Sequence, residues 1–453
     1  MSNLHDTYLR SRFWSPTLTL GVLLIAAFPT YLPAADTFSA SSVSEPPKIS
    51  AADGHRLSIG SATFTLAGYY PSIGAFTTDR NDYTLYQRMI DAMAARGINY
   101  FRIAMNMGQP YGNAINPYLR TGPGLATDGR PKFDLAQFDQ SYFDYWRRVV
   151  TYARDRGVVV QLCMLDSWHS RDDIVEVNLG DLFTWGLRFD YYFPANNING
   201  LNVAQPGSMF DLSNPVNTYQ QALMRKIVDT LGDLPNIVWE IANESGQTAW
   251  EIHQADYVTA YERSRQLKQH LVMPRDLPGH QYVPGQCDNS PANTHADLVQ
   301  AFAQNRVLIS DNDCTDAGTP EIRRQKAWAA LTAGAQVDVF HFELTSDEVL
   351  ASQDATSGMR YVGLQRKFVS DLGLDLAGMR PWDGEVSNGW ALGRYGQEYI
   401  VYLPHGGTTS VYSLASTSRA IWFNPRDGSS GPAGAGTTLT APDNNDWVLY
   451  VHR

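Results

Sequence analysis

Residues 236–244 read Asn-Ile-Val-Trp-Glu-Ile-Ala-Asn-Glu, and this stretch decides the fold. It follows an amphipathic helix that ends near Gly232, and its apolar run is typical of a buried strand. The run closes on Asn243 and Glu244, a carboxamide beside a carboxylate. In a (β/α)8 barrel, polar residues at the C-terminal ends of the strands face the active site. Glu244 is therefore a catalytic candidate from its position alone.

The same unit of amphipathic helix, glycine and apolar strand recurs along the chain. One helix begins near residue 81, stops at Gly97 and precedes the strand 98–105. A second helix over 134–156 stops at Gly157 before the strand 158–165. A later unit runs from residue 321 through Gly334 to the strand 337–342. Apolar strands that alternate with helices imply a parallel sheet covered on both faces.

These units predict a (β/α)8 TIM barrel over residues 36–378, with further strands at 271–273, 295–299 and 306–311. A doubly wound sheet is the alternative, but no glycine-rich phosphate loop follows the first predicted strand, 63–68. After about residue 380, short alternating segments are separated by Gly-Gln, His-Gly-Gly and Asn-Pro-Arg-Asp-Gly turns. Residues 379–453 are therefore predicted to form a small antiparallel β-sandwich domain.

The N-terminal 35 residues have the pattern of a secretory signal peptide. Arg10 and Arg12 precede an apolar run over 18–28, and small residues close the segment at Ala35. The run is short for a membrane span, which favours a cleaved signal. An uncleaved anchor is the alternative. No later stretch is long and apolar enough to cross a membrane. We therefore expect a mature chain without a membrane span, secreted or in the periplasm.

The charge and the cysteines exclude several classes of function. A net charge of −11 argues against nucleic acid as a partner, because phosphate binding needs a clustered basic surface. Cys163 lies inside an apolar strand and is predicted to be a small core residue, whereas Cys287 and Cys314 could pair in an oxidising compartment. No CxxC or His/Cys spacing suggests zinc. We expect no metal and no cofactor.

Two segments resemble known carbohydrate-active proteins. The Asn243-Glu244 pair at the end of an apolar strand resembles the fourth strand of the clan A glycoside hydrolases. That resemblance implies that Glu244 is the acid/base and that Asn243 binds the sugar 2-hydroxyl. The segments 421–428, Ile-Trp-Phe-Asn-Pro-Arg-Asp-Gly, and 446–451, Asp-Trp-Val-Leu-Tyr-Val, resemble the C-terminal module of the apiosidase-like group. That module is named for collagen binding, which we take as a name only.

A second carboxylate is expected at the end of the seventh strand. Retaining glycosidases hold two carboxyl groups about 5–5.5 Å apart, one as nucleophile and one as acid/base. Clan A enzymes usually carry a Glu there, whereas this chain has Asp311-Asn312-Asp313, which is similar to relatives of the apiosidase-like group. Alternation turns both aspartates to the same face. We favour Asp311 as the nucleophile, with Asp313 close behind and a turn or a cation site as the other interpretations.

The spacing of the two carboxylates also decides the stereochemistry. If neither aspartate reaches the anomeric carbon, a wider gap would hold a water molecule and the enzyme would be inverting. Arg102 resembles the clan's second-strand Arg beside the nucleophile, where its charge would lower the pKa of an Asp by about 1–3 units. The alternative is a buried ion pair of Arg102 with Glu240, and both can hold.

Further candidates lie at or after the predicted strand ends. The predicted sugar-binding residues are Tyr69 after the first strand, Trp168 and His169 after the third, and His341 at the eighth. Glu343 is the next carboxylate to consider. Outer subsites are predicted at three aromatic residues: Tyr282, Trp185 and Trp250.

Together these residues predict a secreted glycoside hydrolase that cleaves O-glycosidic bonds of a polysaccharide or oligosaccharide, with retention. Its expected partner is a carbohydrate substrate. The first alternative is a carbohydrate-binding protein that keeps the barrel but has lost turnover, since an Asp replaces the usual Glu on the seventh strand. A polysaccharide lyase is the second, although lyases that act on uronates need a basic subsite.

Overall fold

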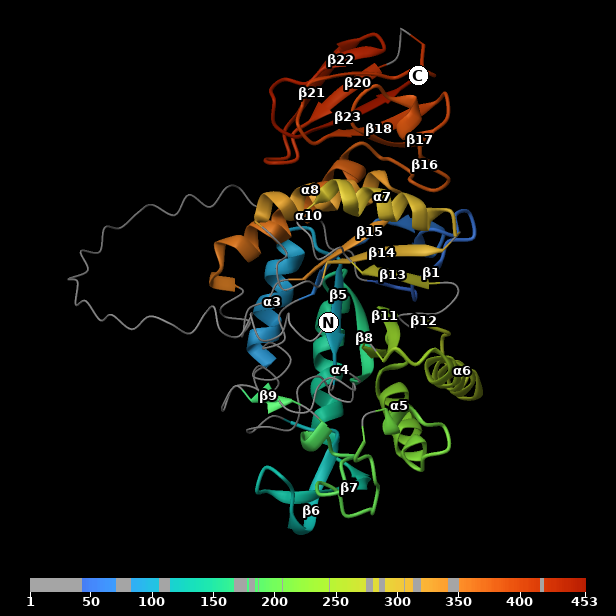
Figure 1. Ribbon diagram of the computed structural model, residues 1–453, viewed down its shortest axis with the longest axis vertical. Helices are drawn as coiled ribbons and strands as arrows, with labels where there is room; N and C mark the ends of the chain where they lie inside the picture. Colours follow the sequence, from blue (N-terminus) through green and yellow to red (C-terminus); the bar gives the residue numbers. More distant parts are fainter. Residues whose placement is uncertain are drawn as a thin grey trace, which may run out of the picture. The chain divides into compact units, whose positions relative to one another are not determined.

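The computed structural model describes most of the chain after residue 42 (Figure 1). The described residues are 43–70, 83–105, 115–166, 177–178, 184–185, 187–205, 207–243, 245–273, 280–284, 290–304, 306–312, 319–340, 350–415 and 419–453. All of them belong to one compact unit, Asp36–Arg453.

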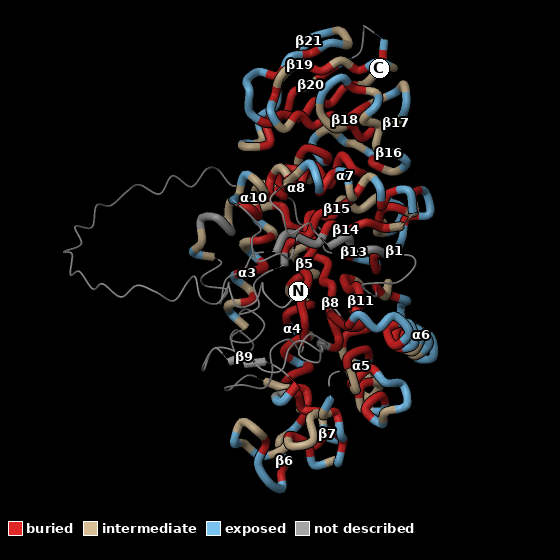
Figure 2. Tube along the Cα trace, in the orientation of Figure 1, coloured by how far each residue is buried: buried red, intermediate tan, exposed pale blue. Residues whose placement is uncertain are grey.

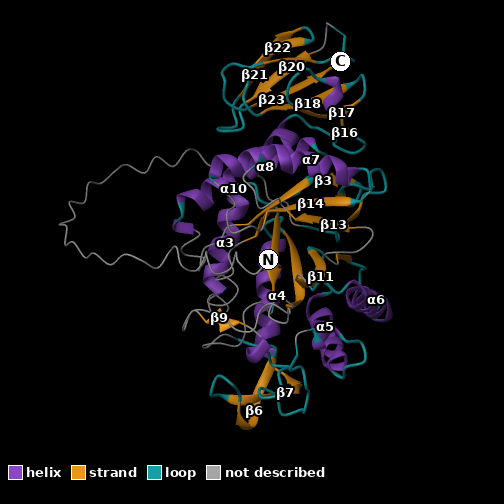
Figure 3. Cartoon of the chain, in the orientation of Figure 1, coloured by secondary structure: helices purple, strands orange, loops and turns teal. Residues whose placement is uncertain are grey.

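Eight parallel strands form the central sheet (Figure 3). In chain order they are β4 (Ala67–Tyr70), β5 (Tyr100–Ala104), β8 (Val159–Asp166), β11 (Ile237–Asn243), β12 (Leu271–Met273), β13 (His280–Pro284), β14 (Val307–Asn312) and β15 (Gln336–Phe340). Each strand pairs with the next, apart from β12 and β13 within the described residues, and β15 pairs with β4. Because the last strand pairs with the first, the sheet is the predicted (β/α)8 barrel.

Helices cover the outside of the barrel. They are α3 (Tyr83–Ala95), α4 (Gln140–Arg154), α5 (Val216–Leu231), α6 (Thr248–Ser264), α7 (Pro291–Phe302), α8 (Pro320–Thr332) and α10 (Gln353–Asp371). The predicted glycine stops are confirmed at Gly97 and Gly334, whose φ angles of 85° and 82° are left-handed and favour glycine. Figure 2 shows the strands buried and the outer side of α6 exposed.

Two predicted elements are wrong. Residues 295–299 lie within α7, which begins at Pro291 directly after the Ser290 cap, and the sixth strand is β13. Ser290 accepts a hydrogen bond from the Asn293 amide, and proline is favoured at this first helical position. The helix predicted over 134–156 begins only at Gln140, because residues 131–138 alternate and pair as a strand with residues 118–125. Asp139 caps the start of α4, because its Oδ1 accepts a hydrogen bond from the Ser141 amide.

The two faces of the barrel strands carry different cores. Phe101, Leu162 and Trp239 point outward into the cluster under the helices. Val159 and Val238 point inward and pack with Leu57 at the N-terminal end of the barrel. That end is covered by a three-stranded sheet of β1 (Lys48–Ile49), β2 (Leu57–Ile59) and β3 (Ala62–Phe64). The predicted first strand, 63–68, therefore spans the end of β3 and the start of β4.

Smaller elements lie in the connections after β5 and β8. They are β6 (Tyr118–Leu125), β7 (Pro131–Phe138), β9 (Val177–Asn178), β10 (Thr184–Trp185) and the 3-10 helices η3 (Leu187–Phe189) and η4 (Ser208–Phe210). The strands pair as the antiparallel hairpins β6-β7 and β9-β10.

The C-terminal residues form an antiparallel sheet in the order β16-β17-β18-β23-β20-β21. These strands are β16 (Arg380–Pro381), β17 (Trp390–Arg394), β18 (Glu398–Leu403), β20 (Arg419–Phe423), β21 (Ser430–Ala435) and β23 (Trp447–His452), and the 3-10 helix η5 (Asp383–Glu385) precedes β17. A second sheet pairs β19 (Thr408–Ser410) with β22 (Thr438–Thr440). The two sheets form the antiparallel β-sandwich that the alternation predicts.

Period-two alternation gives the larger C-terminal sheet two buried faces. Tyr399 and Val401 point into the cluster that also contains Leu439 of β22. Ile400 and Tyr402 point the other way, into a cluster with Trp328 of α8. A buried ion pair also joins α8 to this part of the chain. Arg324 of α8 donates two hydrogen bonds of 2.9 and 3.0 Å to Asp446, the residue before β23.

Candidate active site

The middle of β11 carries a buried charge that the rest of the strand does not. All seven residues of β11 are buried, and Glu240 is the charged one. Arg102 of β5 donates from Nε to Glu240 Oε2 at 2.8 Å and from Nη2 to Oε1. The two side chains are 2% and 0% exposed. A bidentate pair of this kind satisfies both groups in a site where either alone would be strongly destabilising.

Asn243 extends this ion pair toward the strand end. Nη2 of Arg102 also donates to Oδ1 of Asn243 at 2.7 Å. Asn243 is 4% exposed and is the last residue of β11, immediately before Glu244. Because Oδ1 of Asn243 faces the Arg102 cation, Nδ2 forms the other side of the carboxamide and is its hydrogen-bond donor.

One further polar side chain, on the neighbouring strand, contacts Glu240, and a second one supports it in turn. Gln161 of β8 donates to Glu240 Oε2 at 2.7 Å, and the Tyr100 hydroxyl of β5 donates to Gln161 Oε1. Both are fully buried. The chain of contacts Tyr100, Gln161, Glu240, Arg102 and Asn243 therefore crosses three strands, and it ends at the carboxyl edge of the sheet. A buried, connected network of this type fixes side-chain geometry.

Strand seven brings Asp311 to the same edge of the barrel. Asp311 is the fifth residue of β14, with Pro284 of β13 and Asp338 of β15 as its neighbours in register. Asp338 is fully buried. Gly68 of β4 is the neighbour of Asp338 in register, and a Cβ atom on this glycine would lie 2.7 Å from Asp338 Oδ1. The glycine thus leaves room for a carboxylate inside the barrel.

The other predicted site residues divide into two groups. Tyr69 lies in β4, is 0% exposed and belongs to the cluster beneath the helices, so its contact with a sugar stays a prediction. Glu244, Asp313, Trp168, His169 and His341 lie outside the described residues, as do Glu343, Cys287 and Cys314.

Other sequence predictions are decided by burial. Cys163 is confirmed as a core residue: it is 1% exposed, and its Sγ donates to the Leu165 backbone oxygen at 3.2 Å. Trp250 is 2% exposed and packs edge-on against Phe210 with ring centroids 5.0 Å apart, so it is a core residue and the outer subsite predicted there is wrong.

Sequence reasoning did not single out Tyr100, Gln161 and Asp338. Each interrupts an apolar strand with a polar side chain, and that interruption was the available signal. Asp166, which closes β8 opposite Asn243 in register, followed the same strand-end rule as Glu244.

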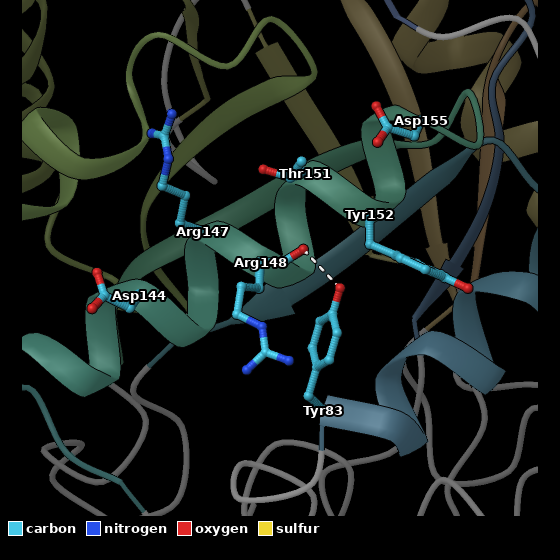
Figure 4. Close-up of a pocket in the computed structure, with 7 residues that line it drawn as sticks. All are labelled: Tyr83, Asp144, Arg147, Arg148, Thr151, Tyr152 and Asp155. Atoms are coloured by element: carbon cyan, nitrogen blue, oxygen red, sulfur yellow. Dashed lines mark hydrogen bonds between the residues drawn. The ribbon is translucent and has the colours of Figure 1, made fainter.

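A pocket of about 450 Å³ lies on the outer surface, where Tyr83 of α3 meets α4 (Figure 4). The Tyr83 hydroxyl donates to the backbone oxygen of Arg148, whose guanidinium covers the Tyr83 ring at 3.9 Å. Arg147 is paired with Asp233. These groups are engaged with one another, and the pocket lies on helices rather than at the strand ends, so we do not assign it to the active site.

The described part of the chain contains no group of three or more His, Cys, Asp or Glu residues placed to hold a metal ion. None of its helices is long and apolar enough to span a membrane.

Residues 63–273 match the cellulase family, glycosyl hydrolase family 5. The matched segment contains Arg102, Glu240, Asn243 and Glu244. No curated protein matches the sequence.

Solved structures of glycoside hydrolases share the fold. A glycoside hydrolase of family 5 from Bacteroides vulgatus superposes with a TM-score of 0.60 at 14% identity, covering 90% of this chain and 93% of that one. A second structure, described as a glycoside hydrolase, gives a TM-score of 0.59 at 13% identity and covers 90% and 97%. The chain therefore shares the fold of these two glycoside hydrolase structures.

Proposed function

We propose that the protein is a secreted glycoside hydrolase that cleaves O-glycosidic bonds of a polysaccharide or oligosaccharide with retention. One observation carries the proposal. The buried set of Glu240, Arg102 and Asn243 ends directly before Glu244, at the strand edge where barrels place their chemistry, inside the segment that matches family 5.

In the first step, Glu244 acts as general acid. It donates its proton to the glycosidic oxygen while Asp311 attacks the anomeric carbon, so that the bond to the leaving sugar breaks and a glycosyl ester forms. In the second step, Glu244 takes a proton from water, which displaces Asp311 and releases the sugar. Two inversions give net retention. Asp313 is the alternative nucleophile.

Asn243 is the residue that we expect to orient the sugar. Since its Oδ1 accepts from Arg102, its Nδ2 donates, and a sugar 2-hydroxyl oxygen is a suitable acceptor. Contacts to the 2-hydroxyl strengthen as the transition state forms. Arg102 therefore acts on the substrate through Asn243, and its own charge is balanced by Glu240.

The proposal is tested by release of reducing ends from a panel of soluble oligosaccharides and aryl glycosides. Wild-type protein should release reducing ends from at least one member of the panel, and Glu244→Gln should lose roughly 10²–10⁴-fold in rate on unactivated glycosides while still binding them. Binding by the wild type without release would favour the alternative, a barrel that binds carbohydrate and has lost turnover.

A further inference from the structure

The exposed aromatic side chains of this chain are unevenly distributed. Among the described residues, the exposed Phe, Trp and Tyr side chains are Tyr395 and Tyr412, at 59% and 62%. Tyr395 lies in the turn between β17 and β18, and Tyr412 lies in the turn after β19. Contiguous exposed apolar surface on a protein marks a binding site.

The two tyrosines sit on segments that are tied to each other. The Tyr395 ring lies 5.3 Å from the Trp382 ring at an interplanar angle of 53°. The Tyr412 amide donates to the Glu385 backbone oxygen at 3.0 Å, and Glu385 in turn donates its amide to the Trp382 oxygen. The segments that carry Trp382, Tyr395 and Tyr412 are therefore adjacent.

A further contact holds the two tyrosine turns together. The Tyr399 hydroxyl accepts from the Gly396 amide at 2.9 Å and lies 2.6 Å from Ser413 Oγ. Gly396 follows Tyr395 and Ser413 follows Tyr412, so a buried side chain of β18 fixes both turns from below. The aromatic surface is thus held by the sheet itself, which limits the entropy that a ligand would have to offset.

Polar residues occur in the same segments as the rings. Glu385 follows Trp382 by three positions, and Gln397, which is exposed, follows Tyr395 by two. The nearby cation, Arg394, is already engaged by Glu398 and by the Ala377 oxygen. Rings in segments that also carry a carboxylate and a carboxamide suit a hydroxyl-rich, uncharged ligand, because the rings cover C–H faces and the polar groups bind hydroxyls.

We propose that this surface, the tyrosine edge (Trp382, Glu385, Tyr395, Gln397 and Tyr412), is a second carbohydrate site that binds a neutral polysaccharide chain. The choice of carbohydrate rests on the proposed function, whereas the existence of a binding surface rests on the rings. An anionic polymer is disfavoured by the net charge of −11. The tyrosine edge would hold insoluble substrate near the barrel without taking part in bond cleavage.

The test is depletion of the full chain from solution by powders of cellulose, mannan and xylan. The variant Tyr395→Ala/Tyr412→Ala should bind roughly tenfold more weakly than wild type to at least one powder. Tyr395→Phe/Tyr412→Phe should keep most of the binding, since it keeps both rings. Leu125→Ala, at an apolar residue that is 64% exposed, is the matched control and should bind as wild type.

Turnover separates this inference from the proposed function. The alanine double variant should cleave soluble oligosaccharides at the wild-type rate, because it leaves the barrel unchanged. If the chain cleaves no glycan but the powder binding still depends on the rings, the tyrosine edge stands and the proposed function fails. Equal depletion of wild type and double variant, or no depletion by any powder, would overturn the tyrosine edge. So would ring-dependent self-association measured by sedimentation without powder binding.

Discussion

Arg102 of β5, the second strand of the barrel, and Glu240 of β11, the fourth strand, form a buried bidentate ion pair. The third strand, β8, lies between them. The pair does two things. It places a charge-balanced unit inside the barrel, and through the 2.7 Å contact of Arg102 with Asn243 it fixes the carboxamide next to Glu244. The same residues therefore stabilise the barrel and fix the geometry of the proposed active site.

Glu240→Gln should strongly destabilise the protein. The substitution keeps the shape of the side chain but leaves the Arg102 cation buried without a counter-charge, at a cost of about 3–5 kcal/mol in the free energy of unfolding. Urea unfolding followed by tryptophan fluorescence measures this. Asp155→Asn, which removes an exposed partner of Arg154, is the matched control and should cost at most about 1 kcal/mol. Equal effects of the two variants would mean that the buried pair is not a structural unit.

Asn243→Asp should move the basic limb of the pH profile of kcat/KM to higher pH. The new carboxylate still accepts from Arg102, but it adds negative charge beside Glu244, which raises the pKa of the general acid. The protonated acid then persists to higher pH. Asn243→Ala is the control: it should lower kcat/KM roughly 10–100-fold through loss of the 2-hydroxyl contact without moving the limb. A limb that moves to lower pH in the Asp variant would show that Glu244 is not the acid.

The C-terminal sheet should lose stability in acid through Asp443. Its carboxylate accepts from Trp447 Nε1 at 2.7 Å and from the Asn445 amide at 2.8 Å, and these hydrogen bonds lower the pKa of Asp443 to about 2, from its ordinary 3.8. A lowered pKa stabilises the folded state above the ordinary value, and this contribution is lost as the pH falls through about 2.

Asp443→Asn should therefore flatten the dependence of the unfolding midpoint on pH between about 4 and 2, as thermal unfolding at several pH values would measure. Asp371→Asn, at an exposed carboxylate on α10, should leave the slope as in wild type. An unchanged slope in the Asp443 variant would assign the acid sensitivity to other carboxylates.

The purified protein should lack the first 35 residues or so when it is made in a secreting host. We expect the basic start and the short apolar run to act as a signal that a peptidase removes. Intact-mass measurement gives the mature N-terminus directly. Retention of residues 1–12 would indicate a membrane anchor, the alternative for this segment.

Much of the barrel follows from periodicity. Apolar runs such as 237–242 and 159–165 are compatible with few structures other than buried strands. Alternation predicted that Glu240 shares the face of Glu244 but lies deeper in the barrel, and the ion pair of Arg102 with Glu240, one of the two roles predicted for Arg102, is confirmed. The sixth strand was missed because β13, His280–Pro284, is short and mixes polar and apolar residues. Residues 295–299, which form part of α7, have over five residues a composition that a strand could also have.

What the sequence could not predict is pairing between distant strands. Gln161 matters because it lies beside Glu240, 79 positions away, and Tyr100 because it reaches Gln161. A single polar residue inside an apolar run looks the same whether it joins such a network or not. The same limit applies to Trp250, whose ring is equally suited to a sugar subsite or to the core, where Phe210 meets it.

The retaining mechanism with Asp311 as nucleophile is tested most directly by azide rescue. Asp311→Asn should lose most turnover, and added azide should restore it from the vacated side and yield a glycosyl azide of inverted configuration, identified by NMR. Asp313→Asn, assayed in parallel, should be less impaired and should give no azide product. Rescue confined to the Asp313 variant would exchange the two assignments. Two inactive variants without rescue, together with an inverted product from the wild type, would contradict the two-step mechanism itself.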